Sequence, residues 1–253
     1  MAVRIAIINC ASREQETFSE GGKSYTASAL LAKKIAEFGE SSGVRFAVRI
    51  YRPPEGPADF PKMDEFDAAI IPGSKHDIDE EGRKANPWME NLLDFIREAH
   101  SRKKPMLGIC FGHQAIAVAF GSGITRMQKG EIGFVPAELT AEGGQDILLR
   151  GVPKKFDSMQ FHFCFVEPLP EGAAALAWGT APKILQAFRI GGTTWGVQFH
   201  PDYSPENVSE AIGRRREALS KSADVGSIRL ETGRRTDDLA LKNFLAFLAL
   251  RSG

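Results

Sequence analysis

Lys104-Pro105-Met106-Leu107-Gly108-Ile109-Cys110-Phe111-Gly112-His113-Gln114 is the stretch that decides the fold of this chain. Residues 105–109 are predicted to form a short apolar strand, and residues 114–120 have the composition of an apolar helix. Cys110 lies on the turn between them, with one glycine two residues before it and another two residues after it. Such a sharp turn leaves little room for side chains, and glycine tolerates its backbone angles.

The position of Cys110 favours a nucleophile over a buried structural cysteine. The turn brings the sulfur to the end of a sheet and to the N-terminus of a helix, where the helix dipole and unpaired N–H groups favour a thiolate. Cysteines are common in protein cores, but a core role does not explain the two flanking glycines. We therefore predict that Cys110 is a nucleophile.

The composition is that of a globular protein with a full core. The 253 residues are 43% hydrophobic and 25% charged, and 32 basic residues balance 32 acidic ones. A nucleic-acid site would need a clustered basic excess, and the first apolar run is too short for a signal peptide or a membrane span. The three cysteines are an odd number without framework spacing, which fits a reducing compartment. We expect a cytoplasmic protein without nucleic-acid or membrane partners.

Strand and helix patterns alternate along the first half of the chain. Strands are predicted at residues 3–9, 46–51 and 67–71, and helices at 25–40 and 86–102. The polar segment 10–24 is expected to be irregular. The alternation predicts a parallel sheet with right-handed crossovers. Because ligands bind beyond the carboxyl ends of such strands, Pro72-Gly73-Ser74 should meet Cys110 at one edge.

The second half of the chain is mainly β in character. Strands are predicted at residues 133–139, 159–166, 173–178, 184–190 and 194–199. The Gly191-Gly192 pair predicts a hairpin between the last two. Helices are predicted over residues 205–220 and 237–250. No linker separates two units, so we predict a single domain, residues 1–253, in which residues 222–253 form a C-terminal arm and helix.

A cysteine nucleophile needs a base, and the base needs a group that orients it. His200 follows a predicted strand, and Asp202 stands two residues later. Alternate residues of an extended segment point the same way, so the carboxylate can hold one imidazole nitrogen while the other faces the sulfur. The alternative is a strand-end histidine beside a surface acid. We predict that Cys110, His200 and Asp202 are the catalytic residues.

Two stretches resemble the signatures of the class I, triad-type glutamine amidotransferases: Leu-Gly-Ile-Cys-Phe-Gly-His-Gln at residues 107–114 and Gly-Val-Gln-Phe-His-Pro-Asp at residues 196–202. The second signature usually ends in glutamate, so Asp202 is a departure. The resemblance implies a flavodoxin-like three-layer α/β sandwich with a mainly parallel central sheet, a small antiparallel β portion and C-terminal helices. It also implies that Cys110 attacks a γ-glutamyl amide to give a thioester that water hydrolyses, without a cofactor or metal.

The resemblance further implies an oxyanion site and a substrate site. Backbone N–H groups of Phe111 and of Gly73 or Ser74 would stabilise the oxyanion. The residues expected to contact the substrate are Gln114, His162, Phe163 and Cys164. Standalone members of the family often carry an acidic residue where this chain has Cys164.

Three functions are compatible with these motifs. The first is a glutaminase that supplies ammonia to a separate synthetase chain, because no ATP-pyrophosphatase signature is present. The second is a standalone γ-glutamyl peptidase that releases an amine, since residues 73–77, Gly-Ser-Lys-His-Asp, resemble those enzymes. The third is a degenerate amidotransferase fold with a regulatory or binding role, against which the intact Cys110 and His200 argue. The expected ligand is glutamine or a γ-glutamyl small molecule, and the oligomeric state is open.

Overall fold

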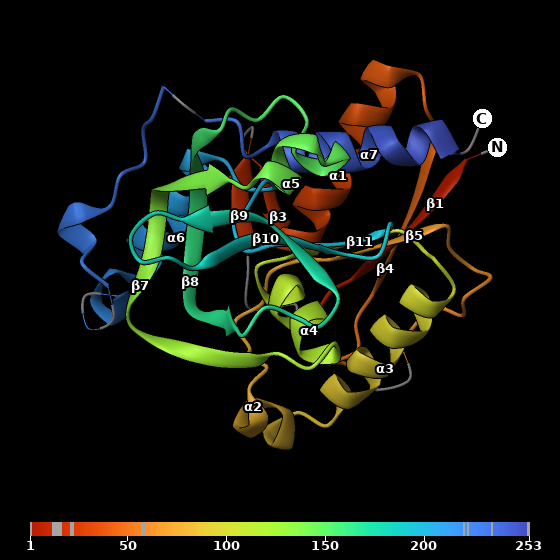
Figure 1. The fold of residues 1–253 in the computed structure, drawn as a ribbon, viewed down its shortest axis with the longest axis horizontal. Helices are drawn as coiled ribbons and strands as arrows, with labels where there is room; N and C mark the ends of the chain where they lie inside the picture. Colours follow the sequence, from red (N-terminus) through yellow and green to blue (C-terminus); the bar gives the residue numbers. More distant parts are fainter. Residues whose placement is uncertain are drawn as a thin grey trace.

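The computed structural model describes residues 2–11, 17–20, 23–56, 59–219, 221, 223–233 and 235–251. Within these residues a mixed sheet of nine strands runs in the order β4-β1-β5-β6-β11-β10-β9-β7-β8. Helices pack against both of its faces (Figure 1). None of the described helices is long and apolar enough to cross a membrane.

Five parallel strands form one half of the sheet. They are β1 (Val3–Ile8), β4 (Phe46–Tyr51), β5 (Ala68–Ile71), β6 (Met106–Ile109) and β11 (Thr194–Val197). Numbered along the chain, their order in the sheet is 2-1-3-4-5, the flavodoxin-like order. Ile5 and Ile7 face one core whereas Ala6 and Ile8 face the other, as expected for strands that are covered on both sides.

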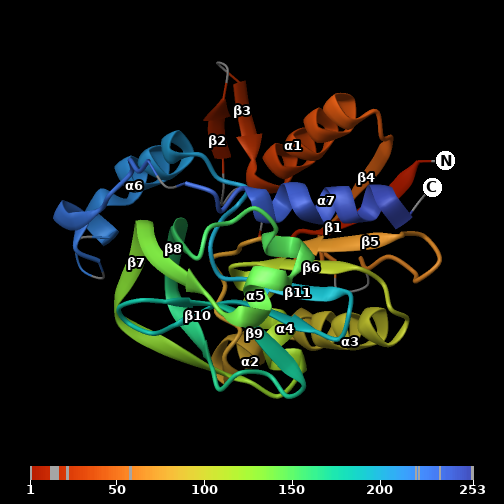
Figure 2. The same cartoon turned by 45° about the horizontal axis from the view of Figure 1, so that its top comes forward.

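The helices complete three layers. α1 (Ala27–Ser42) and α7 (Leu239–Arg251) cover one face, and α3 (Trp88–Ser101) and α4 (Phe111–Ala119) cover the other (Figure 2). α1 ends at Gly43, which has φ 72°, a left-handed conformation that favours glycine at this position. The predicted fold class is confirmed.

The antiparallel strands extend the same sheet. They are β7 (Gly123–Leu139), β8 (Lys155–Glu167), β9 (Ala173–Gly179) and β10 (Leu185–Ile190). β10 and β11 form the predicted hairpin around Gly191. β7 begins ten residues before the predicted strand at 133. The prediction missed this first part because it is mostly exposed and lacks the apolar alternation that marks a strand. Its pairing with β8 holds it in the sheet.

The structure differs from the predicted secondary structure at residues 10–24 and in several short elements that were not predicted. The prediction that residues 10–24 are irregular is wrong in part, because β2 (Thr17–Glu20) pairs with β3 (Lys23–Thr26). Residues 12–16, 21 and 22 lie outside the described residues. The elements that the sequence analysis missed are α2 (Glu80–Ala85), α5 (Ala141–Gln145), η1 (Ile147–Leu149) and η2 (Val225–Ser227). Each is six residues or shorter, too short for a helical period to show.

The C-terminal helices follow the sequence closely. α6 (Pro205–Leu219) begins after Ser204, whose hydroxyl accepts the Asn207 N–H at 3.3 Å while the Asn207 side chain accepts the Ser204 N–H at 2.9 Å. This reciprocal pair caps the helix. The single-domain assignment for residues 1–253 stays a prediction, and residues 222, 234, 252 and 253 of its arm lie outside the described residues.

Gly112 shows how closely the turn at Cys110 packs against the sheet. A Cβ atom on Gly112 would lie 1.9 Å from the carbonyl oxygen of Ile71, so any side chain would force α4 away from β5. We expect Gly112→Ala to cost about 3 kcal/mol of unfolding free energy or more, which corresponds to a Tm lower by roughly 6–12 °C. Thermal unfolding measures this. Gly144→Ala is the control, because no atom lies within 4 Å of its added Cβ; equal losses in both variants would contradict the packing argument.

Candidate active site

Cys110 lies at the end of β6, directly before α4. Its φ of 51° and ψ of −102° are strained for a residue other than glycine. The Cys110 N–H donates to the Val197 carbonyl at 2.8 Å, and its own carbonyl accepts the Gln114 N–H at 3.1 Å to open α4. The thiol lies 3.8 Å from the carbonyl oxygen of Phe161. This is the geometry of a nucleophile elbow, which presents the sulfur above the edge of the sheet.

His200 and Asp202 follow β11, the strand next to β6, and lie at the same edge of the sheet as Cys110. β11 pairs in parallel with β6, so its continuation brings His200 beside Cys110. The Nδ1 atom of His200 lies 3.2 Å from Oδ1 of Asp202, and both residues are buried. The backbone N–H of His200 donates to the Met159 carbonyl at 2.7 Å. One face of the imidazole stacks on Tyr203, with ring centroids 4.1 Å apart, a contact that the sequence analysis missed.

The environment of His200 suits transfer of a proton in both directions. Burial lowers its pKa, but the negative charge at Cys110 and the hydrogen bond to Asp202 outweigh burial and raise the pKa to about 10. His200 therefore carries a proton at neutral pH. Acylation of the sulfur removes the negative charge at Cys110, the largest of the causes that raise the His200 pKa. Burial then favours the neutral ring, which can accept a proton from water.

This pKa predicts the alkaline limit of activity. Because the His200 pKa is raised, the ring keeps the proton that the leaving group needs until the pH rises through about 10. We expect kcat/KM to stay high through the weakly alkaline range and to fall only near that pH. A kcat/KM profile measured in overlapping buffers at constant ionic strength tests this. An alkaline limb near the ordinary histidine pKa of about 6.5 would contradict it.

The residues predicted to supply oxyanion donors lie next to Cys110 in space or in sequence. A Cβ atom on Gly73 would lie 2.8 Å from Cε1 of His200 and 3.7 Å from Cβ of Cys110, so the backbone of residue 73 approaches both of these side chains. Phe111 is the first residue of α4, and N–H groups of a first turn have no partner within the helix. The Ser74 hydroxyl donates to the Cys10 carbonyl at 2.8 Å and thereby fixes the loop. The oxyanion role of these backbone groups stays a prediction.

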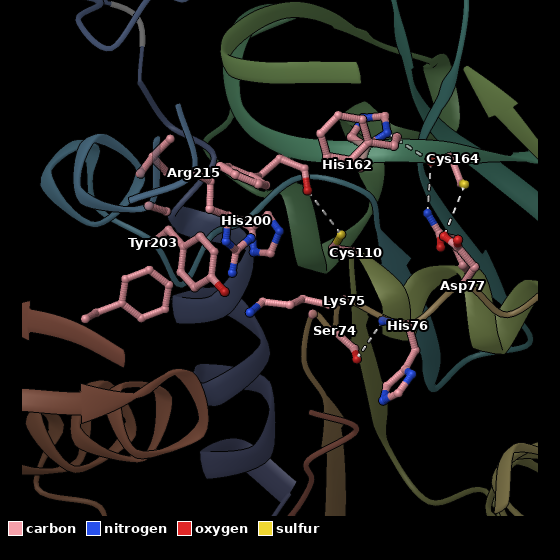
Figure 3. Close-up of a pocket in the computed structure, with 17 residues that line it drawn as sticks. Ser74, Lys75, His76, Asp77, Cys110, His162, Cys164, His200, Tyr203 and Arg215 are labelled. Atoms are coloured by element: carbon pink, nitrogen blue, oxygen red, sulfur yellow. Dashed lines mark hydrogen bonds between the residues drawn. The ribbon is translucent and has the colours of Figure 1, made fainter. Parts of the chain in front are cut away.

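A pocket of about 160 Å³ opens over Cys110 (Figure 3). Its lining includes every residue predicted to contact the substrate, namely Gln114, His162, Phe163 and Cys164. Gly73, Ser74 and His200 also line it, whereas Asp202 lies behind the imidazole ring. In the part of the chain that the structure describes, no three His, Cys, Asp or Glu side chains group as metal ligands.

The predicted substrate residues also hold the wall of the pocket together. Gln114 Nε2 donates to the Cys164 carbonyl at 2.9 Å and to Oε1 of Gln198 at 3.2 Å. His162 Nδ1 lies 2.9 Å from the same carbonyl, and its Nε2 lies 3.0 Å from Oε2 of Glu131. These contacts fix the β8 backbone over the pocket. Direct contact of the side chains with a substrate stays a prediction.

Cys164 stands where standalone members of the family often carry an acidic residue. Its thiol donates to Oδ1 of Asp77 at 3.5 Å, and burial, aided by the negative charge of Asp77, raises the Cys164 pKa to about 12. Asp77 also pairs with Arg126. A carboxylate therefore reaches this wall from the loop after β5. Burial likewise raises the pKa of Cys10, so both of these cysteines are held as thiols.

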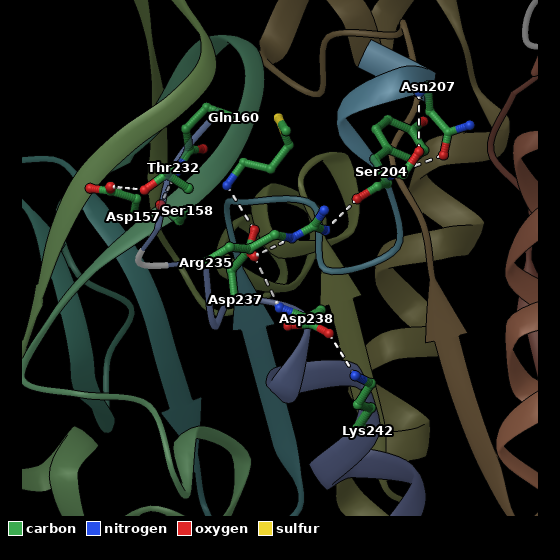
Figure 4. Close-up of polar contacts among 12 residues, drawn as sticks. Asp157, Ser158, Gln160, Ser204, Asn207, Thr232, Arg235, Asp237, Asp238 and Lys242 are labelled. Carbon is green, nitrogen blue, oxygen red and sulfur yellow. Dashed lines mark hydrogen bonds and ion pairs between the residues drawn. The ribbon is translucent and has the colours of Figure 1, made fainter. Parts of the chain in front are cut away.

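Residues of the C-terminal arm hydrogen-bond to the backbone of Met159, next to His200, and of Tyr203 (Figure 4). The buried Asp237 carboxylate accepts the Met159 N–H at 2.7 Å, and the Met159 carbonyl in turn accepts the N–H of His200. Arg235 contacts Asp237 at 3.1 Å and donates to the Tyr203 carbonyl at 2.5 Å. The sequence gives no signal for these contacts, because the polar arm carries no motif.

Comparison with known proteins gives relatives of two kinds. Residues 28–216 match the family model described as glutamine amidotransferase class-I. The chain is 31% identical over 149 residues to one component of the glutamine-hydrolysing GMP synthase of Sulfurisphaera tokodaii, covering 59% of this chain and 73% of that protein. It is 28% identical over 155 residues to gamma-glutamyl peptidase 4 of Arabidopsis thaliana, covering 60% of each chain. The match thus spans less than two thirds of the plant peptidase.

Solved structures share the fold over nearly the whole chain. A glutamine amidotransferase from Thermotoga maritima superposes with a TM-score of 0.74 at 19% identity, covering 98% of this chain and 99% of that one. A glutamine amidotransferase from Methylobacillus flagellatus gives a TM-score of 0.66 at 20% identity, covering 99% and 91%. At these identities the likeness shows the architecture alone.

Proposed function

The chain belongs to the class I glutamine amidotransferase family, and we propose that it hydrolyses a γ-glutamyl amide through a thioester on Cys110. The observation that carries this proposal is the pairing of a strained elbow cysteine with a buried histidine that a carboxylate holds at 3.2 Å. A merely structural cysteine needs neither the positive φ nor the imidazole beside it.

The reaction follows from the protons and charges at the site. The Cys110 thiolate attacks the γ-carbonyl carbon, and the carbonyl oxygen becomes an oxyanion near the N–H groups of Phe111 and of Gly73 or Ser74. The oxyanion collapses, the C–N bond breaks, and the leaving nitrogen takes the His200 proton. Water then attacks the thioester while His200 accepts its proton. The C–S bond breaks, which frees the γ-carboxyl group of glutamate and restores the thiolate and the imidazolium.

Two leaving groups fit this chemistry. Glutamine would give ammonia for a separate synthetase chain, a role that the similarity to a GMP synthase component supports. A γ-glutamyl peptide would instead give an amine, which the similarity to gamma-glutamyl peptidases supports. The apolar residues Val208 and Ala211 in the pocket lining favour the second candidate, because ammonia gains nothing from apolar surface.

Product analysis separates the two candidates. The purified chain is incubated with glutamine and, separately, with a γ-glutamyl dipeptide, and the released ammonia or amino acid is measured against time. The proposal expects glutamate from at least one of the two substrates. If neither reacts, alone or with a candidate synthetase, the chain is a degenerate amidotransferase with a regulatory or binding role, and the proposal is wrong.

Asp202 is expected to support catalysis without being indispensable. It holds the His200 tautomer and helps to raise the His200 pKa. We expect Asp202→Asn to lower kcat/KM on the order of 10- to 1,000-fold, about 1.4–4 kcal/mol of barrier, and to move the alkaline limb to lower pH. Glu206→Gln is the matched control, because Glu206 is exposed at the start of α6. Wild-type rates from Asp202→Asn would leave either a Cys110–His200 dyad or another acid such as Glu206, and slow turnover by Glu206→Gln would identify the latter.

A further inference from the structure

The proposed reaction determines on which side of Cys110 each half of the substrate lies. His200 protonates the leaving nitrogen, so the amine half of the substrate lies on the His200 side of Cys110. Figure 3 shows His200, Tyr203 and Arg215 on one side of the sulfur and Cys164 on the other. The glutamyl half therefore faces the Cys164 wall, and the His200 side is left for the amine.

The His200 side is apolar and aromatic. Tyr203 and Arg215 locate the other lining residues of this side: Phe18 contacts Tyr203, Phe161 contacts Arg215, and Val208 and Ala211 lie on α6 with Arg215. The apolar and aromatic residues among these come from β2, β8 and α6 and the turn before α6, and they belong to one hydrophobic cluster. The stack of His200 on Tyr203 continues to Phe18, whose ring centroid lies 4.8 Å from that of Tyr203. An aromatic surface thus runs from the catalytic imidazole outward, where an apolar side chain gains by burial.

Arg215 of α6 adds a positive charge to this wall. Its guanidinium carbon lies 5.8 Å from the centre of the Phe161 ring. Across the described ranges of the chain, no carboxylate pairs with Arg215, whereas the neighbouring Arg214 pairs with Glu210 at 2.7 Å. A half-buried guanidinium over an aromatic face is suited to bind a planar carboxylate through two parallel hydrogen bonds.

We propose that the amine half of the substrate is an apolar, preferably aromatic, amino acid, and that Arg215 binds its carboxylate. γ-Glutamyl-phenylalanine is a member of this class. The inference rests on the proposed thioester chemistry at Cys110 and names the substrate class for that site. Glutamine uses neither the apolar wall nor Arg215, and a γ-glutamyl arylalkylamine uses the wall alone.

Three substrates test the inference on the full chain: γ-glutamyl-phenylalanine, γ-glutamyl-phenethylamine, which has the same ring without the carboxylate, and glutamine. We expect kcat/KM for γ-glutamyl-phenylalanine to exceed that for the phenethylamine roughly 10- to 100-fold, the range for a hydrogen bond to a charged group. Arg215→Gln should reduce this ratio to about one. Arg216→Gln, which changes an exposed arginine on the same helix, should preserve it.

A separate variant tests the contribution of the apolar residues on the His200 side. Ala211→Leu fills the space beside α6, so it should lower kcat/KM for both aromatic substrates roughly tenfold relative to glutamine. A wild-type enzyme that prefers glutamine would overturn the inference while leaving the thioester chemistry intact. An equal loss on all three substrates in Arg215→Gln would place Arg215 against the glutamyl half and would overturn it too. Turnover of none of the three, alone or with a candidate synthetase, would overturn the proposed function and this inference with it.

Discussion

Cys110→Ala is expected to abolish turnover of every γ-glutamyl substrate. The variant removes the atom that forms the thioester, and no other described residue can replace it, because Cys10 and Cys164 are buried and held as thiols. A loss on the order of 10⁶-fold in kcat follows the effect of removing a triad nucleophile elsewhere. Steady-state assays of glutamate release measure the loss, and the thermal unfolding curve of the variant serves as the control for folding.

The same variant tests the electrostatic coupling at the site. The charge at Cys110 is the largest cause that raises the His200 pKa. Removing it leaves burial and Asp202 in opposition, so the His200 pKa should fall. Titration of the histidine ring signals by NMR measures the shift, with His100, which bonds Thr194 at the start of β11, as an internal reference. A His200 pKa that stays near 10 in Cys110→Ala would contradict the coupling.

His200→Ala is expected to cause the second largest loss. The ring donates the proton to the leaving nitrogen and then activates water, and its removal also leaves the buried Asp202 carboxylate without the partner at 3.2 Å. We expect kcat to fall on the order of 10⁴-fold or more. Assays across the neutral pH range measure this effect.

The matched control for that variant is His100→Ala, which removes a histidine that lies outside the pocket lining. It should keep wild-type kcat/KM. If His200→Ala retained a tenth of wild-type activity at neutral pH, the general acid and base would be another group, and the assignment of His200 would be wrong.

The sequence predicts that Cys110, His200 and Asp202 come together, because the determinants of this arrangement are local. The glycines beside Cys110, the strand that precedes it and the two-residue spacing from His200 to Asp202 all act within a few residues. Gly112 fits under Ile71 with no room for a Cβ atom, which is the reason that the elbow needs glycine. Alternation of strands and helices then places the strand ends together, as the parallel order of β5, β6 and β11 shows.

The supporting residues are not predictable in this way, because their contacts span long distances in sequence. Asp237 reaches Met159 across 78 residues, and Phe18 reaches Tyr203 from the opposite end of the chain. Asp77 meets Cys164 only after the loop beyond β5 folds against β8. Some of these residues lie in stretches with a sequence signal, as Asp77 and Cys164 do, but no pattern indicates which distant residue each of them contacts, so only the tertiary structure reveals these pairs.

Formation of a covalent thioether between Cys110 and a diazo-ketone analogue of glutamine, with loss of dinitrogen, is the most direct test of the central claim. The full chain is incubated with diazo-oxo-norleucine, an electrophilic glutamine analogue, and digested, and the cysteine-containing peptides are analysed by mass spectrometry. We predict an adduct on the peptide that contains Cys110, none on those that contain Cys10 or Cys164, and none in Cys110→Ala. An unmodified Cys110, or an adduct on either of the other two cysteines instead, would contradict the account.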